Sequence, residues 1–475
     1  MLQFTSLDRE TPPKRDAKVR RDDFAEIYEQ FAEAKAAEQA GRCSQCGVPF
    51  CSNHCPLGND IPDWLRLVAE GRLQEAYAAS SATNNFPEIC GRICPQDRLC
   101  EGVCVIEQSG HGTVTIGAVE QYITETAWAN DWIKPIAPAQ ERAQSVGVIG
   151  AGPAGLAAAE ELRRAGFQVK VYDRYDRIGG LLIYGIPNFK LEKEIVARRA
   201  CRLNESGVVF ELNVDIGGDI HFDEIRNRHD AVLIATGVYQ PRELTCPGAG
   251  NRGVVKALDY LTASNRKGLG DEVAAFDDGD LNANGKKVVV IGGGDTAMDC
   301  VRTAVRQGAS SVTCLYRRDR ANMPGSAREV KNAEEEGVVF EWLAAPKAML
   351  GSVEKATGVR AARMELGPPD GSGRRSPTEI SGSDFDLGAD LIIKALGFEP
   401  DDLPAIFNEK KLTVTERGTI RVHPQTFETA LQGVYAAGDI VRGASLVVWA
   451  IHDGRAAAAA ITDRLMTARA PLAAE

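Results

Sequence analysis

The chain has 475 residues, which is enough for about three domains, and its 44% hydrophobic and 25% charged residues are ordinary for a globular protein. The net charge is −11 and no basic run occurs, so we expect no nucleic-acid partner. No apolar run reaches the ~18 residues of a membrane span and the charged N-terminus lacks the apolar core of a secretory signal, so we expect a cytoplasmic protein without membrane contact.

Two helices are predicted near the N-terminus. Residues 22–40 are rich in Ala and Glu, and Phe24, Ile27, Tyr28 and Phe31 recur at helical spacing. We interpret this stretch as an amphipathic packing helix and assign it no chemistry. Residues 61–78 are predicted to form a second helix.

Eight of the twelve cysteines fall between Cys43 and Cys104, and in a cytosolic chain this favours metal binding over disulfides. Zinc sites usually pair two CxxC units, but only one is present here. Each run contains a Cys-Pro, as in two-cluster ferredoxins. We therefore favour iron–sulfur clusters over zinc or unliganded thiols, and a sequential assignment gives four cysteines to each. The runs are Cys43-x2-Cys46-x4-Cys51-x3-Cys55-Pro56 and Cys90-x3-Cys94-Pro95-x4-Cys100-x3-Cys104.

A dinucleotide-binding turn is predicted after a linker at residues 130–144. A buried strand, 146–149, leads into Gly150-x-Gly152-x-x-Gly155 and then a helix, 156–165, which is the context that such a turn requires. The three glycines allow a tight turn, close approach of a pyrophosphate, and close packing of helix on strand. The phosphates would bind at the helix N-terminus, beside Pro153 and Ala154.

Further segments fit a flat ligand beside this turn. A strand at 168–172 ends in Asp173, about 20 residues beyond the glycines, which favours a ribose contact over a solvated loop acid. Glycine-dense or small-residue segments follow, as expected where backbone passes over a cofactor. Their candidate contact residues are Gly180, Leu181, Thr236, Gly237, Gly438 and Asp439. In this order the segments resemble flavoprotein reductases with two dinucleotide-binding domains, so the first turn is predicted to hold FAD.

The turn is repeated later in the chain. A strand at 286–291 leads into Gly292-x-Gly294-Asp295-Thr296-Ala297, a helix at 298–307 and a strand at 311–316. Where the first copy has Asp173, this copy has Tyr316 followed by Arg317 and Arg318. Arginines bind a 2′-phosphate that an acid would repel, so we predict NADPH over NADH; the alternative is an exposed arginine pair. A strand at 390–397 closes the unit, and residues 364–386 are predicted to form a hairpin or surface loop.

The sequence offers no groups for chemistry other than electron transfer. The sequence shows no cysteine pair beside the predicted flavin site, no catalytic triad and no HExxH motif. We therefore assign no catalytic residue and predict electron transfer carried by cofactors.

Five segments together resemble the family of NADPH-dependent glutamate synthase small (β) subunits. They are the Cys43–Cys104 pattern, GAGPAGL at Gly150, GGLLIYGIPNFKL at Gly179, IGGGDTAMDC at Ile291 and AAGDIVRGASLVVWAI at Ala436. The module is also similar to the N-terminal half of dihydropyrimidine dehydrogenase, to NADPH:ferredoxin oxidoreductase and to sulfide dehydrogenase subunits.

The resemblance implies an α/β fold of the two-domain flavoprotein reductase type, with a helical iron–sulfur domain in front. We expect the iron–sulfur domain at 1–140, a Rossmann-like FAD-binding domain at 141–284 and 400–475, and a Rossmann-like NADPH-binding domain at 285–399. It also implies two [4Fe-4S] clusters with crossed ligands. The first would take Cys43, Cys46, Cys51 and Cys104, and the second Cys55, Cys94, Cys100 and Glu120. Cys90 would remain a structural thiol; Glu120 by itself would be interpreted as a surface carboxylate.

The implied function is electron input. A hydride would pass from NADPH to FAD, and single electrons would then pass through the clusters to a large (α) subunit. That partner would carry FMN and a further iron–sulfur cluster and make L-glutamate from glutamine and 2-oxoglutarate. Two alternatives remain open: a reductase of the same fold serving ferredoxin or sulfur species, and a non-catalytic zinc-stapled nucleotide-binding scaffold.

Overall fold

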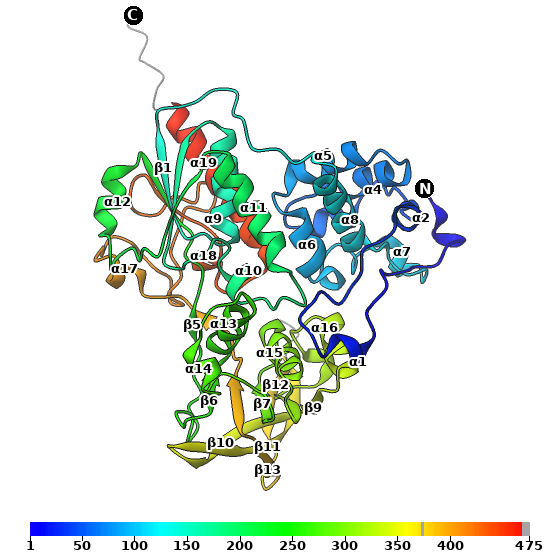
Figure 1. Cartoon of the computed structure of the whole chain (residues 1–475), viewed down its shortest axis with the longest axis vertical. Helices are drawn as coiled ribbons and strands as arrows, with labels where there is room; N and C mark the ends of the chain where they lie inside the picture. Colours follow the sequence, from blue (N-terminus) through cyan, green and yellow to red (C-terminus); the bar gives the residue numbers. More distant parts are fainter. Residues whose placement is uncertain (372–374, 468–475) are drawn as a thin grey trace, which may run out of the picture.

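The computed structural model describes residues 1–371 and 375–467, which form a helical unit and two α/β units (Figure 1). The helical unit lies beside the first α/β unit, and the second α/β unit lies below both. Within the described residues, no helix combines the length and the apolarity needed to cross a membrane.

The helical unit is built from short helices around a core that contains Trp64, Leu65, Val119 and Ile123. Its elements are η1 (Gln3–Thr5), α1 (Ala17–Arg20), α2 (Glu33–Gly41), α3 (Phe50–His54), α4 (Ile61–Ala69), α5 (Leu73–Thr83), α6 (Pro87–Ile93), η2 (Gln96–Arg98), α7 (Val105–Gln108) and α8 (Ile116–Ala129).

The helix predicted over 22–40 is wrong in its first half, because helix α2 begins only at Glu33. The preceding segment, residues 8–32, which we call the strap, crosses to the second α/β unit with only one short helix, α1 (Figure 1). Phe24 of the strap packs on the first α/β unit, where its ring lies 6.3 Å from that of Phe189. The helix predicted over 61–78 is divided near Gly71, whose positive φ of 74° interrupts it.

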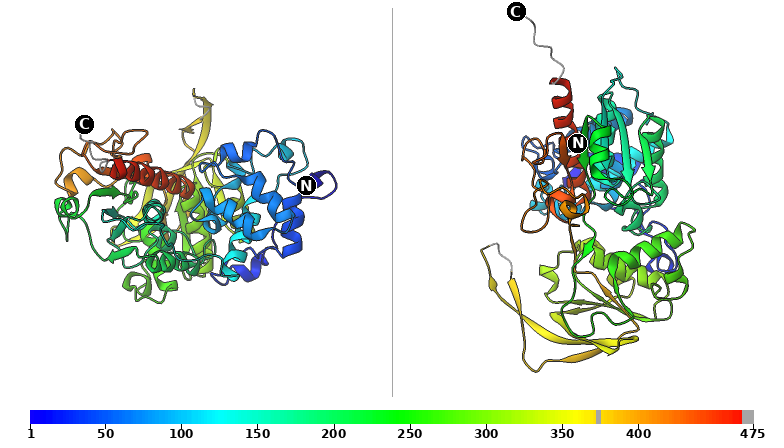
Figure 2. Two further views of the ribbon diagram at one scale, coloured as in Figure 1. Left: turned by 90° about the horizontal axis from the view of Figure 1, so that it is seen from above. Right: turned by 90° about the vertical axis from the view of Figure 1, so that its left-hand side faces the viewer.

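The first α/β unit has a parallel sheet with strand order β16-β4-β1-β2-β3. The long C-terminal helix α19, red in Figure 2, lies against α9. In a doubly wound sheet, ligands bind beyond the carboxyl ends of the strands, which places the β1–α9 turn at the binding edge. The elements are β1 (Ser145–Ile149), α9 (Pro153–Arg164), β2 (Gln168–Asp173), α10 (Leu181–Tyr184), α11 (Lys193–Glu205), β3 (Val209–Leu212), α12 (Phe222–Arg228), β4 (Ala231–Ile234), α17 (Leu403–Ile406), β16 (Val434–Ala436), α18 (Asp439–Arg442) and α19 (Val447–Thr467).

The second α/β unit repeats this plan in a parallel sheet of order β6-β14-β7-β8-β9. The repeat extends to the turns: Gly150 N donates to Tyr172 O at 2.8 Å, and Gly292 N donates to Leu315 O at 3.1 Å. The elements are β6 (Val254–Lys256), α13 (Ala257–Gly268), α14 (Ala274–Asp277), β7 (Lys287–Ile291), α15 (Asp295–Arg306), β8 (Ser311–Tyr316), η3 (Arg320–Asn322), α16 (Ala327–Glu335), β9 (Val339–Trp342) and β14 (Leu391–Lys394).

An antiparallel sheet extends from the second unit (Figure 2, right). It confirms the predicted hairpin over the described part of 364–386, since β11 pairs with both β12 and β13. The strands are β10 (Ala344–Ser352), β11 (Lys355–Pro369), β12 (Arg375–Glu379) and β13 (Phe385–Gly388).

The structure moves one predicted domain boundary. Strand β6 pairs with β14, with Val255 opposite Ile393, so the second unit already includes residue 254 and the predicted start at 285 falls inside it. A three-residue strand is too short to be recognised by periodicity. The chain passes between the α/β units through β5 (Gln240–Pro241) and β15 (Phe398–Glu399), which pair antiparallel.

Candidate functional site

The first glycine turn leaves an open space beside Gly152. A Cβ added at Gly150 would overlap Ala235 O, and one added at Gly155 would overlap Gly150 O. A Cβ at Gly152 would meet nothing within 4 Å, although its neighbours in the turn are closely packed. Gly152 is also the N-cap of α9, and no side chain caps that helix end. The backbone here therefore offers N–H groups to a ligand at the N-terminus of α9.

Asp173 shapes this turn. Its Oδ2 accepts a hydrogen bond from Ala151 N at 2.6 Å, and its Oδ1 accepts one from Tyr175 N at 2.8 Å. Burial raises the pKa of Asp173, while these two backbone donors oppose the rise. The carboxylate is thus fixed at the end of β2 and faces the same cavity as the turn.

A cavity of about 260 Å³ brings the three units together. It is lined by residues of both glycine turns and by one cysteine segment. From the first α/β unit come Gly150, Gly152, Pro153, Ala154, Asp173, Leu181, Thr236, Gly237 and Asp439; from the second come Asp295, Thr296, Asp299, Ser326, Arg328 and Glu329; from the helical unit come Ile93, Cys94 and Pro95. We call this the shared cavity.

Two observations test whether the shared cavity fits a dinucleotide. The first is the open space beside Gly152. The second is Thr236, whose Oγ1 is buried without a hydrogen-bond partner among the described residues. This is expected of a group whose partner is a bound ligand. The predicted residues Gly180 and Gly438 pack behind the turn, against Gly152 and Ala154 respectively.

The second turn has the same form. A Cβ at Gly294 would meet nothing within 4 Å, and Ala297 is fully buried, as close helix packing requires. Asp295 Oδ1 accepts a hydrogen bond from Ser326 N at 2.9 Å. Beyond β8, Arg317 is exposed, whereas Arg318 is buried and its Nε donates to Arg375 O at 2.9 Å.

Four cysteines of the helical unit form one group, which we call the outer thiol set: Cys43, Cys46, Cys51 and Cys104. Burial raises the pKa of Cys51 to about 12, and nearby Cys43 and Cys104 add to the rise. Gln45 donates to Cys43 Sγ from both its backbone N and its Nε2, at 3.4 Å each. The set joins Cys104 to the first cysteine run.

A second group, the inner thiol set, contains Cys55, Cys94, Cys100 and Glu120. Burial raises the pKa of Cys55 to about 11, and nearby Glu120 adds to the rise. Glu120 is not the surface carboxylate that the residue alone suggests. It is 7% exposed, and its Oε1 accepts hydrogen bonds from Asn59 Nδ2 at 3.2 Å and Asn84 Nδ2 at 3.1 Å. Burial raises the pKa of Glu120 to about 8.

The structure thus brings Cys104 near Cys43 and Cys51, and Cys55 near Cys94 and Cys100, which is the proximity that the crossed pairing expects. Cys90 is buried beside Cys94, and its Sγ lies 3.8 Å from Asn84 Oδ1. Thiolates are the usual protein ligands of iron–sulfur clusters, so the donors of both sets suit such groups. Within residues 1–371 and 375–467, no three His, Cys, Asp or Glu side chains converge closely enough to hold a single metal ion.

Sequence reasoning missed a group of charged residues in the wall of the shared cavity: Lys190, Asp299, Arg328 and Glu329. Lys190 Nζ donates to Asp299 Oδ1 at 2.8 Å. One signal was available, because Asp299 follows Asp295 by one helical turn and so shares its face of α15. Lys190 has no comparable signal, since only the fold brings its loop to α15.

Two protein families match the chain. Residues 20–132 match the family described as dihydropyrimidine dehydrogenase domain II, 4Fe-4S cluster. Residues 144–454 match the family described as pyridine nucleotide-disulphide oxidoreductase.

Similar proteins cover almost the whole chain. It is 63% identical to the glutamate synthase [NADPH] small chain of Azospirillum brasilense, over 97% of this chain and 95% of that protein. It is 45% identical to the small chain of the same name from Escherichia coli K12, over 98% and 99%. Mycobacterium tuberculosis FprA in complex with NADPH has a similar fold, with a TM-score of 0.58 and 20% identity over 69% of this chain and 86% of that one. Thioredoxin reductase of T. acidophilum has a TM-score of 0.50 and 20% identity, over 68% and 99%.

Proposed function

Because this chain belongs to the family of NADPH-dependent glutamate synthase small chains, we propose that it is the electron-input subunit of such an enzyme. It is an NADPH-dependent oxidoreductase with an iron–sulfur domain. The observation that carries the proposal is the shared cavity, where two dinucleotide turns meet a cysteine segment.

The first turn would hold FAD and the second NADPH. NADPH supplies a hydride when bound, and FAD converts the electron pair into single electrons. The open backbone at Gly152 and the end of α9 would bind the FAD pyrophosphate, while Asp173 would accept from a ribose hydroxyl. Thr236 and Asp439 would complete the polar contacts, and Leu181 the apolar ones. Gly294 would serve the NADPH pyrophosphate in the same way, and Arg317 and Arg318 its 2′-phosphate.

The two thiol sets would hold two [4Fe-4S] clusters. Cys94 lines the shared cavity and belongs to the inner set, so the inner cluster would receive electrons from the flavin side. The outer set shares the helical unit with it and would pass electrons onward. An oxygen ligand from Glu120 would complete the inner set, and its two asparagine partners would hold the carboxylate in place.

Electrons would leave at an apolar surface beside the outer thiol set. Val48, Phe50 and Val105 are exposed large apolar residues, and each lies within two positions of a cysteine of this set. Leu2 is 59% exposed, and its N donates to Cys43 O at 3.1 Å. Exposed apolar residues gathered on one surface mark interaction sites. We infer that the large subunit, which would carry FMN and a further iron–sulfur cluster, docks here.

The test uses chain purified without oxygen, alone and with its large subunit. We expect one FAD and about eight iron atoms per chain, and NADPH oxidation by the complex that requires both glutamine and 2-oxoglutarate. Colourless protein, or equally fast NADPH oxidation by the complex without 2-oxoglutarate, would contradict the proposal.

Three variants test the ligand sets separately. Cys46→Ser should remove the outer cluster, Cys55→Ser should remove the inner one, and each should leave about half of the iron. Glu120→Ala should behave like Cys55→Ser. The exposed Asp63→Ala on α4 is the control and should retain all of the iron. If Cys55→Ser and Cys46→Ser removed the same cluster, the sequential assignment would replace the crossed one.

A further inference from the structure

A buried ionic chain begins at the shared cavity. Lys190 lies in the loop between α10 and α11 of the first α/β unit and reaches across to the second unit. Its Nζ lies 2.8 Å from Asp299 Oδ1 and 4.0 Å from Glu329 Oε2. The three side chains are only 12%, 9% and 5% exposed. Burial opposes the charge of Lys190, but Asp299 and Glu329 outweigh it and raise the pKa of Lys190 above its usual value.

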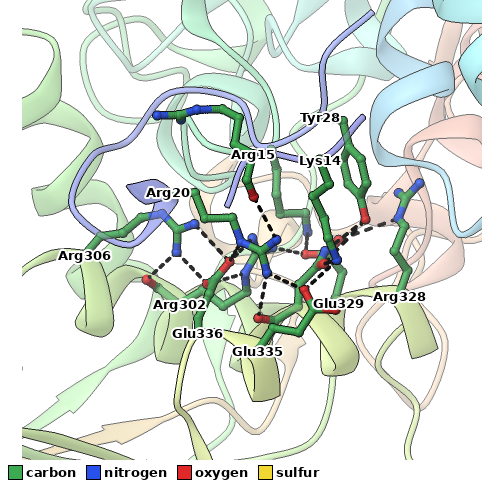
Figure 3. A network of polar contacts seen from close by, with 12 residues as sticks. Lys14, Arg15, Arg20, Tyr28, Arg302, Arg306, Arg328, Glu329, Glu335 and Glu336 are labelled. Atoms are coloured by element: carbon green, nitrogen blue, oxygen red, sulfur yellow. Dashed lines mark hydrogen bonds and ion pairs between the residues drawn. The ribbon is translucent and has the colours of Figure 1, made fainter. Parts of the chain in front are cut away.

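The chain continues through the second unit to the strap. Arg302 Nη1 binds Glu329 Oε2 at 2.5 Å, and its Nη2 binds Glu336 Oε1 at 2.9 Å. Arg20 of the strap binds the same Glu336 oxygen through its Nε at 2.9 Å. Figure 3 shows the strap end of this series of ion pairs, with Arg20 and Arg302 pointing toward Glu336 from the strap and from α15. One ionic path thus joins the first unit, the second unit and the strap.

Aromatic contacts strengthen the same junction. Phe189, next to Lys190, lies under two guanidinium groups, with Arg302 at 4.5 Å and Arg306 at 4.0 Å from the ring centroid. The strap residue Phe24 lies beside the same ring. Cation–π contacts gain strength when they are desolvated, so the loop that carries Lys190 is held from both sides.

The contacts around Lys190 matter because only two backbone segments connect the two α/β units. Only β5 and β15 pass between the α/β units, and units joined in this way move relative to each other unless their interface prevents it. On the α13 side, the units are joined by partly exposed ion pairs, Arg266 with Asp176 and Arg177 with Asp271, and by a buried hydrogen bond from Asn265 Nδ2 to Tyr184 O at 2.9 Å. Exposed pairs contribute little. Hydride transfer needs its reacting atoms about 3–3.5 Å apart, so the orientation of the units affects the rate directly.

We propose that Lys190 is a positioning residue for the reaction: held by Asp299 and Glu329, it fixes the second α/β unit against the first, and the ionic chain extends this hold to the strap through Arg20. The inference rests on the proposed function for its kinetic consequence. Its structural consequence, restricted motion at β5 and β15, is independent of the reaction.

The experiment compares Lys190→Met with Lys190→Arg in the full-length, cofactor-loaded chain. The first readout is hydrogen–deuterium exchange at the connecting segments 236–243 and 395–400, measured by mass spectrometry. We expect faster exchange there in Lys190→Met and near wild-type exchange in Lys190→Arg, which keeps the charge. The second readout is the rate of flavin bleaching by NADPH. This rate should fall about 10- to 100-fold in Lys190→Met, with KM for NADPH changed less than about 3-fold.

Two further variants and a control complete the test. Asp299→Asn removes a charge at almost constant shape, and it decides the question if Lys190→Met does not accumulate as folded protein. Arg20 lies at the opposite end of the series of ion pairs from Lys190, and Arg20→Met should raise hydrogen–deuterium exchange at the same two segments. Lys347→Met, which removes an exposed ion pair on β10, is the matched control and should match wild type in both readouts.

The outcomes separate the two proposals. Wild-type exchange at both segments in Lys190→Met and Asp299→Asn would overturn the positioning role, as would a KM rise without a fall in rate. A wild-type chain whose flavin is not reduced by NADPH would instead overturn the proposed function, and the exchange comparison would still decide the positioning role.

Discussion

Arg199 and Glu88 form a two-pronged ion pair that is buried on both sides, with Nε–Oε1 at 2.5 Å and Nη2–Oε2 at 2.8 Å. Glu88 lies on α6, the helix that leads to Cys94, and Arg199 lies on α11 of the first α/β unit. The pair therefore holds the cysteine segment of the shared cavity against the unit that would bind FAD.

The first prediction concerns this pair. Glu88→Gln keeps the shape of the side chain but leaves the Arg199 charge buried without its counter-charge. Breaking a buried pair in this way costs about 3–5 kcal/mol, so we expect a clear fall in the urea midpoint of the cofactor-loaded chain. Glu70→Gln, at an exposed pair with Arg72, is the control and should leave the midpoint unchanged. Equal midpoints for both variants would show that the Arg199–Glu88 pair is not important for docking.

The two glycine turns allow a matched pair of variants. Gly152 and Gly294 both have negative φ, and an added Cβ meets only open space at each, so alanine should fold normally at both positions. Gly152→Ala should lose FAD, because the methyl group would occupy space needed by the pyrophosphate. Gly294→Ala should retain FAD and raise KM for NADPH. Flavin absorbance and steady-state kinetics measure the two effects. The reverse pattern would exchange the two nucleotide assignments.

Cofactor choice is predicted to depend on the arginines after β8. Arg317→Ala should lose charge-assisted hydrogen bonds to the 2′-phosphate, worth about 1.5–3 kcal/mol, which corresponds to a KM for NADPH about 10- to 100-fold higher. KM for NADH should not change. Arg318→Ala should show the same selectivity with an added loss of stability, since Arg318 is buried and bound to Arg375 O. An equal rise in KM for NADPH and for NADH would refute the assignment of these arginines to the 2′-phosphate.

Lys193 gives a prediction for the pH dependence of stability. It donates to the carbonyl oxygens of Leu182 and Ile186, and burial lowers the pKa of Lys193 to about 7. Its unfolded pKa is about 10.4, so between these values the unfolded chain binds more protons. Lys193 should therefore make the wild type more stable as pH rises from about 7 to about 10, by up to about 1.4 kcal/mol per unit.

The measurement is the free energy of unfolding at several pH values. The free energy of unfolding of the wild type, minus that of Lys193→Met, should rise with pH across this window. The exposed Lys410→Met is the control, and its curve should run parallel to that of the wild type. A constant difference for Lys193→Met would mean that Lys193 remains charged in the folded chain.

Much of the fold follows from local pattern. Apolar runs such as 146–149 and 287–291 are buried strands, and the glycines that follow them turn as their spacing predicts. The repeat also predicted a second sheet like the first. These features depend on neighbouring residues, so a single sequence contains the necessary information.

The failures come from contacts between distant segments. Phe24 and Tyr28 lie at helical spacing, but they pack on Phe189 and beneath the guanidinium of Arg328, and this tertiary burial overrides helix propensity. Arg20 has the local sequence of an exposed residue, yet it is 1% exposed beside Glu336, far along the chain. Glu120 is similar, because only the fold brings two asparagines and four cysteines to it.

The paired connection between the α/β units also means that the second α/β unit is an insertion that can be replaced as a whole. In β5 and β15, Gln240 lies directly opposite Glu399, so both ends of the inserted unit are neighbours. The sheet that receives the insert is completed by β16, which comes after it in the chain. A different nicotinamide-binding unit could therefore be grafted between Pro241 and Phe398 without redesigning the thiol sets or the first turn. The graft would need to supply counterparts of Asp299 and Glu336, because these carboxylates accept the hydrogen bonds that Lys190 and Arg20 donate from the retained part of the chain.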